Sequence, residues 1–298
     1  MRIRRIRSDA VKKTLQRAFH FIKKLYQRFQ ADEIPALGAE FAYHLLLAFF
    51  PFLIFLVTVL TYTPLVQPQS LADLLQVLPA DAYAVVATTV NEIFATNRPN
   101  ILSISVILAI WSSSNGFMAI ARGLNRAYDC KETRKFYTVR AMAILFTLLI
   151  AFSILLEMVA IVFGDMLIAK ISEKLCWSCS GVTLSHILQL ILPVGMLLVL
   201  FTLLYTIIPN RTLRAKEVLP GAAFTSVVWV VSSMLFSAYV NNFANFARLY
   251  GSLGGVIVLM LWLYLSSMVM LIGSEINATL YFEKEERKSV RKRNDKDL

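Results

Sequence analysis

Six long apolar stretches, separated by polar connections, dominate the pattern of this 298-residue chain. Each has about 21–24 residues, close to the ~20 residues that cross ~30 Å of hydrocarbon at about 1.5 Å per residue. We therefore expect an all-α, polytopic membrane protein with six transmembrane helices. The expected spans are Ala39–Tyr62, Ile101–Ala121, Ala141–Phe163, Ile187–Ile208, Leu219–Val240 and Leu253–Ile276.

The positive charge of the chain lies in every second segment between these spans. Of the 30 Lys and Arg residues, 26 fall in residues 1–38, 122–140, 209–218 and 277–298, and only 4 in the alternate loops. Cytoplasmic loops of membrane proteins carry this excess. We expect both termini in the cytoplasm and the protein in the plasma membrane, which is the inner membrane of a bacterium with two. The net charge of +11 is then a topology signal, and nucleic acid is not an expected partner.

The composition and charge pattern divide the chain into three parts. Residues 1–38 form a basic cytoplasmic segment, 39–280 the six-helix transmembrane domain, and 281–298 a charged cytoplasmic tail. At 57% hydrophobic and 16% charged residues, the chain is not an ordinary soluble domain.

The N-terminal segment contains a basic amphipathic helix over residues 10–30. Apolar side chains recur there at helical spacing, at Val11, Leu15, Phe19, Ile22, Tyr26 and Phe29. Such a helix is expected to lie on the anionic cytoplasmic leaflet, with about 1 kcal/mol of attraction for each basic residue. Membrane lipids are therefore expected partners. The helix acts either as a plain topology anchor or as a lipid sensor.

The first external segment, residues 64–100, is the longest loop between spans. Its apolar positions predict two short helices, bounded by prolines, that fold against the outer mouth of the bundle. They serve either as a lid or as simple packing of a long loop.

The second span is the least apolar of the six. It holds Ser112, Ser113, Ser114 and Asn115 in one run. Such residues let membrane helices approach closely, or they line a wet cavity. Asn115, Arg122 and Arg126 occupy positions i, i+7 and i+11, so a single helical face carries all three.

Acidic residues inside the membrane need a partner or a function, because a charge near the bilayer centre costs several kcal/mol. Glu157 lies about 24 Å along the third span, in the outer leaflet. It is either a substrate or proton site, or a neutral acid bonded to a neighbouring helix.

Glu40 and His44 on the first span and Glu275 at the end of the sixth should reach the cytoplasmic face, as should Arg122 and Arg126. These charges form either an internal gate or anion site, or ion pairs that hold the bundle together.

No enzymatic motif or cofactor site is apparent. Cys176 and Cys179 form a CxxC in the second external loop, which favours a local disulfide. A redox motif would need a βαβ context, and zinc would need more ligands than the nearby His186. The three histidines are kept apart by topology, and phosphate-loop, GxSxG, HExxH and EF-hand patterns are missing. We therefore expect neither catalysis nor a bound metal or cofactor.

Particular residues resemble the YihY/BrkB family of membrane proteins over residues 20–282. The resemblance rests on Ala39–His44 (AEFAYH) with Phe50 and Pro51, and on Trp111–Tyr128 (WSSSNGFMAIARGLNRAY), Tyr205–Ala222 (YTIIPNRTLRAKEVLPGA) and Tyr250–Leu280 (with YGSLGG, LWLY and GSEINA). It implies six transmembrane helices in the bacterial inner membrane. The family has carried a ribonuclease label, widely regarded as an error, and a virulence-factor name, and some members have been linked to export of lipid or lipopolysaccharide precursors. The resemblance assigns no role to His44.

Three functions compete for this chain. A transporter or flippase of a lipid-like or anionic substrate fits the polar second span, Glu157, and the stripe of Arg122 and Arg126. A non-transporting scaffold or envelope assembly factor would use the basic N-terminal helix and the C-terminal tail for docking. A membrane enzyme, the third alternative, would need convergent groups such as Glu40, His44 and Glu275.

Overall fold

The computed structural model describes residues 19–61, 99–175, 181–243 and 253–294, together with the single positions 16, 88 and 250. Some stretches inside its helices, among them 157–175 and 181–192, are described by their backbone alone. Every regular element in this part of the chain is helical, which confirms the all-α class. Nearly all of the first external segment, with its two predicted short helices, lies outside the described residues, as do Cys176 and Cys179.

Six long helices coincide with the six predicted spans, to within one residue where a span reaches past its helix. They are α2 (Ile34–Thr61), α5 (Pro99–Ala127), α6 (Phe136–Leu175), α7 (Gly181–Ile207), α8 (Ala215–Phe243) and α10 (Gly254–Asn294). A further helix over residues 19–31 precedes α2, so the described part of the predicted N-terminal helix is helical.

Four of the six helices contain described stretches long and apolar enough to cross a membrane. These stretches are Ile34–Leu53, Phe136–Ile154, Ala215–Asn241 and Gly254–Ser289. In α7 the described apolar stretch is shorter, Pro193–Ile207, and several parts of α5 are described by their backbone alone. The chain is therefore a membrane-integral helical protein.

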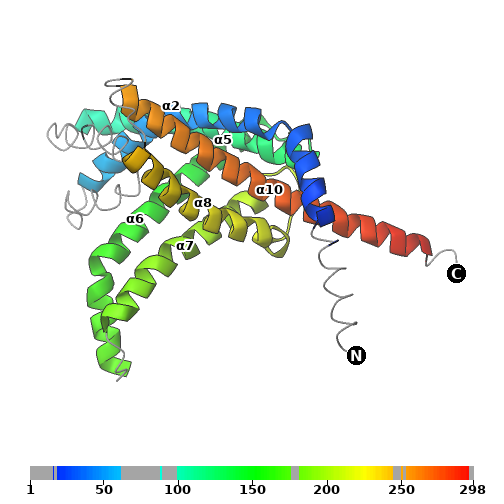
Figure 1. Cartoon of the computed structure of the whole chain (residues 1–298). Helices are drawn as coiled ribbons and strands as arrows, with labels where there is room; N and C mark the ends of the chain where they lie inside the picture. Colours follow the sequence, from blue (N-terminus) through cyan, green and yellow to red (C-terminus); the bar gives the residue numbers. More distant parts are fainter. Residues whose placement is uncertain are drawn as a thin grey trace.

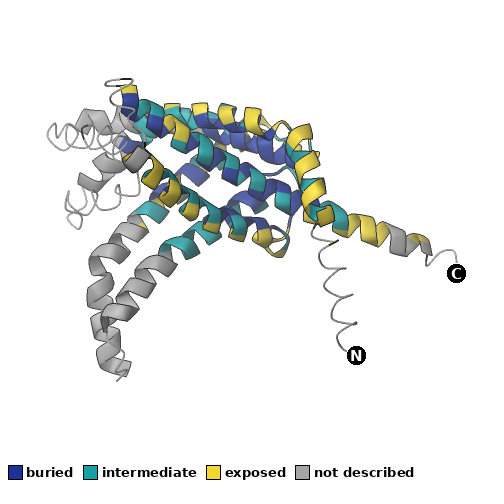
Figure 2. Cartoon of the chain, in the orientation of Figure 1, coloured by how far each residue is buried: buried dark blue, intermediate teal, exposed yellow. Residues whose placement is uncertain are grey.

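The helices form a closed ring in which each contacts the next along the chain, and α10 returns to α2. α10 also contacts α5 and α8, and it runs diagonally through the bundle (Figure 1). α6 and α7 lie beside each other and extend away from the other four helices (Figure 1). Buried residues gather where α2, α5, α8 and α10 meet (Figure 2).

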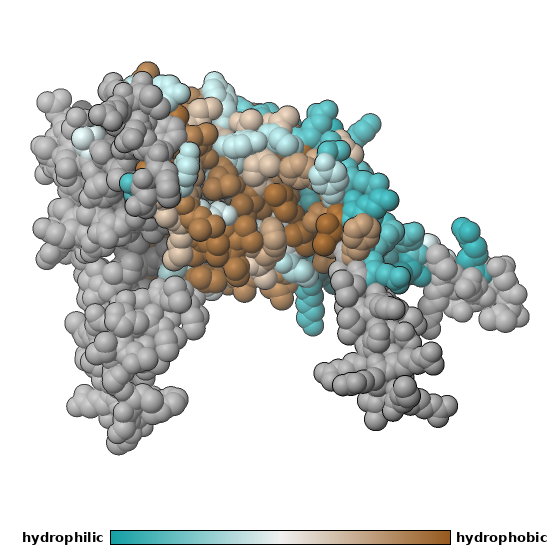
Figure 3. Space-filling model, viewed as in Figure 1, coloured by the Kyte–Doolittle hydropathy of each residue, from teal (hydrophilic) through white to brown (hydrophobic). Residues whose placement is uncertain are grey.

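Large apolar side chains are exposed on the outside of the bundle. Examples are Ile107 on α5, Phe152 on α6 and Leu235 on α8, each more than 60% exposed. Figure 3 shows apolar residues covering the middle of this face and hydrophilic ones at the end from which α10 emerges. Water would disfavour so large an apolar surface, whereas lipid tails would cover it.

α8 and α10 approach so closely at Gly221 and Gly273 that neither position has room for a side chain. A Cβ atom at Gly221 would meet the carbonyl oxygen of Gly273 and the side chain of Asn277. A Cβ atom at Gly273 would meet the hydroxyl groups of Thr225 and Tyr205. Glycines at such contacts let membrane helices pack backbone against backbone.

Polar contacts continue this interface along both helices. The Gly221 amide donates to Asn277 Oδ1 at 2.7 Å, and the Tyr205 hydroxyl of α7 donates to the Met270 carbonyl at 2.6 Å and lies 2.8 Å from Thr225 Oγ1. We call this interface the α8–α10 seam, formed by Gly221, Thr225, Trp229 and Ser233 of α8 with Asn277, Gly273, Ser266 and Trp262 of α10.

The two tryptophans complete the seam. Trp229 donates its indole N–H to Ser266 Oγ at 3.1 Å, and Trp262 donates to Ser233 Oγ at 3.3 Å. The α8 members recur every four residues, so they share one helix face. The two indole N–H groups, the Gly221 amide and the Tyr205 hydroxyl thus all donate to partners inside the protein, as a lipid environment requires.

We expect Gly221→Ala to destabilise the protein by about 1–3 kcal/mol, because the added methyl group overpacks a backbone contact. Gly195→Ala in α7 is the matched control, because a Cβ atom there meets no described atom within 4 Å. The control should be neutral or slightly stabilising, since Ala is the better helix former. Thermal unfolding in detergent measures both, and equal stability of the two variants would contradict the close contact.

Candidate functional site

The connections between helices converge at one end of the bundle, which we call the basic end. It comprises the helix over 19–31 with its turn at 32–33, the connections 128–135 and 208–214, and α10 from Glu275 onward. Hydrogen bonds join all four of these segments. This is the hydrophilic end of the molecule in Figure 3.

A buried ion pair between Arg28 and Glu275 lies at the centre of the basic end. Arg28 Nε donates to Glu275 Oε2 at 3.0 Å, and the Glu275 side chain is only 1% exposed. The same guanidinium donates to the Ala127 carbonyl at the end of α5 and lies 3.7 Å from Asp32 and 3.8 Å from Asp129. One arginine therefore ties the N-terminal helix to α5 and α10 at once.

Aromatic rings on α10 support two arginines. The Cζ atom of Arg28 lies 4.9 Å from the centre of the Phe282 ring, and that of Arg211 lies 4.4 Å from the centre of the Tyr281 ring. Arg211 also donates to the Tyr281 hydroxyl at 3.1 Å and to the Tyr128 carbonyl at 3.3 Å. Stacking on a ring face holds a guanidinium in place without a counter-charge.

Tyr128 fills the space between these groups. It is 1% exposed, and its ring meets that of Tyr281 edge-on, with 6.1 Å between ring centres. Burial, with smaller effects of the Glu217 and Glu275 carboxylates, raises the pKa of Tyr128 well above its ordinary value of 10.0. Its hydroxyl therefore stays neutral. Together, the aromatic rings and guanidinium groups fill the interior of the basic end.

The two arginines of the predicted α5 stripe face acids of α2 and of the turn before it. Arg122 forms an ion pair with Glu40, and these side chains are 45% and 41% exposed. Arg126 lies 3.6 Å from Asp32 and 3.8 Å from Glu33.

The charged residues that were predicted to lie together near the cytoplasmic face thus form separate ion pairs. Glu40 pairs with Arg122, whereas Glu275 pairs with Arg28, which the sequence had not associated with it. Asn115 is partly buried two turns before Arg122 on α5. Glu157 lies on α6, but its side chain is outside the described set.

His44 lies on α2, and its backbone carbonyl faces Gly116 of α5. Its ring nitrogen Nδ1 is buried and has no hydrogen-bond partner among the described residues. In the described part of the chain, no group of three or more His, Cys, Asp or Glu residues is arranged to hold a metal ion.

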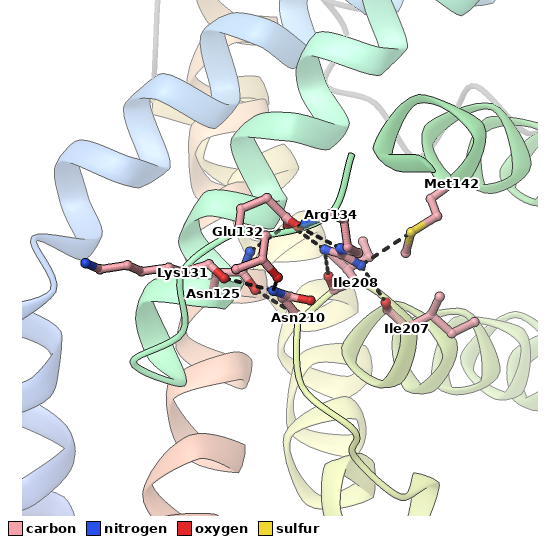
Figure 4. A network of polar contacts seen from close by, with 9 residues as sticks. Asn125, Lys131, Glu132, Arg134, Met142, Ile207, Ile208 and Asn210 are labelled. Carbon is pink, nitrogen blue, oxygen red and sulfur yellow. Dashed lines mark hydrogen bonds and ion pairs between the residues drawn. The ribbon is translucent and has the colours of Figure 1, made fainter. Parts of the chain in front are cut away.

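A second polar network at the basic end joins the two connections and centres on Arg134 (Figure 4). Arg134 binds Glu132 through two nitrogens, at 2.8 and 2.6 Å, and donates to the Ile208 carbonyl just after α7 at 2.6 Å. An arginine that caps the end of a helix satisfies carbonyl groups that lack a partner within it. The charge pattern of the sequence does not predict this network; its one trace there is that Glu132 and Arg134 lie two residues apart.

Two asparagines complete this network (Figure 4). Asn125 Nδ2 donates to Glu132 at 3.0 Å, and the Asn210 backbone amide donates to Asn125 Oδ1 at 2.7 Å. Asn210 Nδ2 donates to the Lys131 carbonyl at 2.8 Å. The turns after α5 and after α7 are thereby locked together, beside a shallow open hollow lined by residues 206, 207 and 209–213.

Comparisons with known proteins agree with this membrane architecture. Residues 25–297 match the family model described as virulence factor BrkB. YfkH of Bacillus subtilis (strain 168), named as a ribonuclease-like protein, is 39% identical over 265 residues, which cover 89% of this chain and 96% of YfkH. A UPF0761 membrane protein of Tolumonas auensis is 27% identical over 273 residues, 89% of this chain and 86% of its own. No solved structure matches.

We expect Arg28→Met to destabilise the protein by about 3–5 kcal/mol, because the Glu275 carboxylate loses its cation inside the protein. Lys24→Met is the matched control on the same helix, since its partner Glu286 is 68% exposed, and it should cost about 0–1 kcal/mol. Unfolding in detergent measures both, and the double change Arg28→Met with Glu275→Met should recover part of the loss. Equal effects of the two single changes would refute the importance of the buried pair.

The Glu132 network predicts a pH-dependent contribution to stability. The hydrogen bond from Arg134 holds the pKa of Glu132 below its ordinary value of 4.5. Because the folded-state pKa is lowered, the contribution is complete above pH 4.5 and disappears as the pH falls through the lower, folded-state value.

We therefore expect Glu132→Gln to cost about 1 kcal/mol at neutral pH, since the carboxylate is partly exposed and partly screened. The difference between wild type and variant should shrink below pH 4.5. Melting temperatures across this range measure it, with Glu286→Gln as an exposed control. A constant difference at all pH values would argue against an ionised Glu132 in the network.

Proposed function

Because the chain belongs to the BrkB family of membrane proteins, we propose that it is a transporter or flippase of a lipid-like or anionic substrate. The observation that carries the proposal is the ion pair of Arg122 and Glu40. It bridges two helices, and both side chains are nearly half exposed, so at the cytoplasmic level of the proposed topology a solute can reach them. An anionic group can replace the Glu40 carboxylate on Arg122 and keep the arginine paired.

The proposed topology has six crossings with both termini in the cytoplasm of a bacterium, so that the basic end faces the cytoplasm. It is supported by six long helices, four of which contain described stretches of membrane-crossing length. The excess of Lys and Arg in the segments at this end supports the orientation.

In this proposal the candidate residues line one route between the two faces. Glu157 serves the outer part, Asn115 the middle, and Arg122 with Glu40 the cytoplasmic part. Arg126 and Glu275 belong to the group of residues around Arg28 that closes the cytoplasmic end. In this proposal that group is the inner gate. Opening the gate would require Arg28 to leave Glu275, Asp32 and the Ala127 carbonyl together.

A scaffold or assembly factor is the alternative, and the long C-terminal part of α10 favours it. This helix has 41 residues and projects well beyond the bundle (Figure 1). Its charged side chains there are largely exposed, including Lys284 at 55% and Arg287 at 77%. Crosslinking in cells from α10 should then capture one stoichiometric partner, whereas a transporter needs none.

Transport is tested with purified protein in vesicles that carry a fluorescent phosphatidylglycerol analogue, whose movement across the bilayer is read by chemical quenching. We expect Arg122→Ala to slow this movement about tenfold, the factor for one lost hydrogen bond to a charged group. Glu157→Gln should slow it as well. Arg287→Ala is the control, since this exposed arginine lies far along α10 and pairs with Glu283 on the same helix.

A charge exchange separates substrate binding from helix pairing. Glu40→Arg with Arg122→Glu keeps the ion pair but moves the cation to α2. If Arg122 binds the substrate, the exchanged protein stays slow. Recovery of transport would show that the pair only holds α2 and α5 together. If the unaltered protein moves no lipid or solute from a broad anionic panel, the proposal is excluded.

A further inference from the structure

The helix over residues 19–31 presents one covered and one uncovered face. Its inner face holds Arg28 on Glu275 and Lys24 on Glu286. Its outer face carries Phe19, Ile22 and Tyr26, which are 72%, 61% and 60% exposed. These three positions are three and four residues apart, so they form a single apolar stripe.

The helix is held across the end of the membrane domain. Glu33 adopts a left-handed backbone conformation, with φ of 52°, and ends the helix just before α2 begins. The helix therefore turns across the end of the bundle instead of continuing along α2 (Figure 1). With the bundle upright in a bilayer, its axis would run along the surface of the leaflet.

Aromatic residues near the start of α6 indicate the level of the lipid headgroups at this end. Phe136 and Tyr137 are each more than 60% exposed. Arg140 lies 5.6 Å over the Phe136 ring, and Lys135 lies 5.7 Å over the Tyr137 ring. Exposed aromatic rings beside cations are typical of the membrane–water interface.

We propose that Phe19, Ile22 and Tyr26 insert between the headgroups of an anionic leaflet, with Lys23 binding lipid phosphate groups beside them. Lys23 is exposed and adjoins the stripe. Residues 1–38 contain 10 Lys and Arg, the sign of charge that an anionic leaflet attracts. A helix with this composition binds in the plane of the interface.

This binding has a consequence for the inner gate, because the same helix carries Arg28. Tyr26 and Arg28 lie about 160° apart around the helix axis, at about 100° per residue. Lipid on one face and Glu275 on the other therefore hold the helix from opposite sides. The inference goes beyond the transport proposal and holds whether or not the protein moves a substrate.

The test uses the full chain in vesicles, with Cys130, Cys176 and Cys179 replaced by serine and one spin label at Ile22→Cys. Gln27→Cys is the matched control, exposed on the same helix and about 140° away from Ile22. In phosphatidylcholine vesicles containing phosphatidylglycerol, oxygen should relax the label at 22 several-fold more strongly than a water-soluble nickel reagent does. The label at 27 should be relaxed more strongly by the nickel reagent than by oxygen. In vesicles of pure phosphatidylcholine, the difference between the two labels should be smaller.

Equal access of the nickel reagent to both labels in the anionic vesicles would overturn the proposal. So would protection of position 22 that appears only after a cytosolic fraction is added, because the face would then belong to a protein partner. With the label moved to Phe19→Cys, Ile22→Asp should abolish the oxygen preference, whereas Gln27→Asp, the same added charge on the polar side, should keep it. Circular dichroism of each variant verifies that the protein remains folded.

Discussion

The Glu275 carboxylate is buried to 1% exposure, and the arrangement of the whole basic end follows from its need for a cation. A buried carboxylate is costly unless a partner compensates its charge. Arg28 supplies that charge only because the N-terminal helix folds back across the bundle. The Ala127 carbonyl, Asp32 and Phe282 then fix the arginine from three further sides. Four segments of the chain are thus organised around one ion pair.

The molecule satisfies its polar groups in two different ways. Along the α8–α10 seam, neutral donors and acceptors bond directly across a glycine contact. At the basic end, charged side chains bond to carboxylates and to carbonyls at helix ends, as Arg134 does with Glu132 and Ile208. The first kind suits a lipid surrounding, where an unpaired charge is expensive. The second suits the boundary with water, where arginines remain ionised and partly solvated.

The helices could be predicted from the sequence because a bilayer demands long apolar segments, and each expected span coincides with one long helix to within one residue. The family resemblance is confirmed over 25–297. The contact of Arg122 with Glu40 was within reach, since both were placed near the same depth. The pair of Arg28 and Glu275 was not, because it joins positions 247 residues apart and depends on how a helix outside the spans folds back. The close contact of Gly221 with Gly273 could not be predicted for a similar reason, because only the crossing of α8 and α10 brings the two glycines together.

The backbone contact of Gly221 with Gly273 has a mechanical consequence. Two helices that touch without intervening side chains, and are pinned by indole and amide bonds, have little freedom to slide or rotate against each other. They therefore form a rigid pair. A rearrangement of the helices would have to leave this pair intact and take place at the other helix contacts.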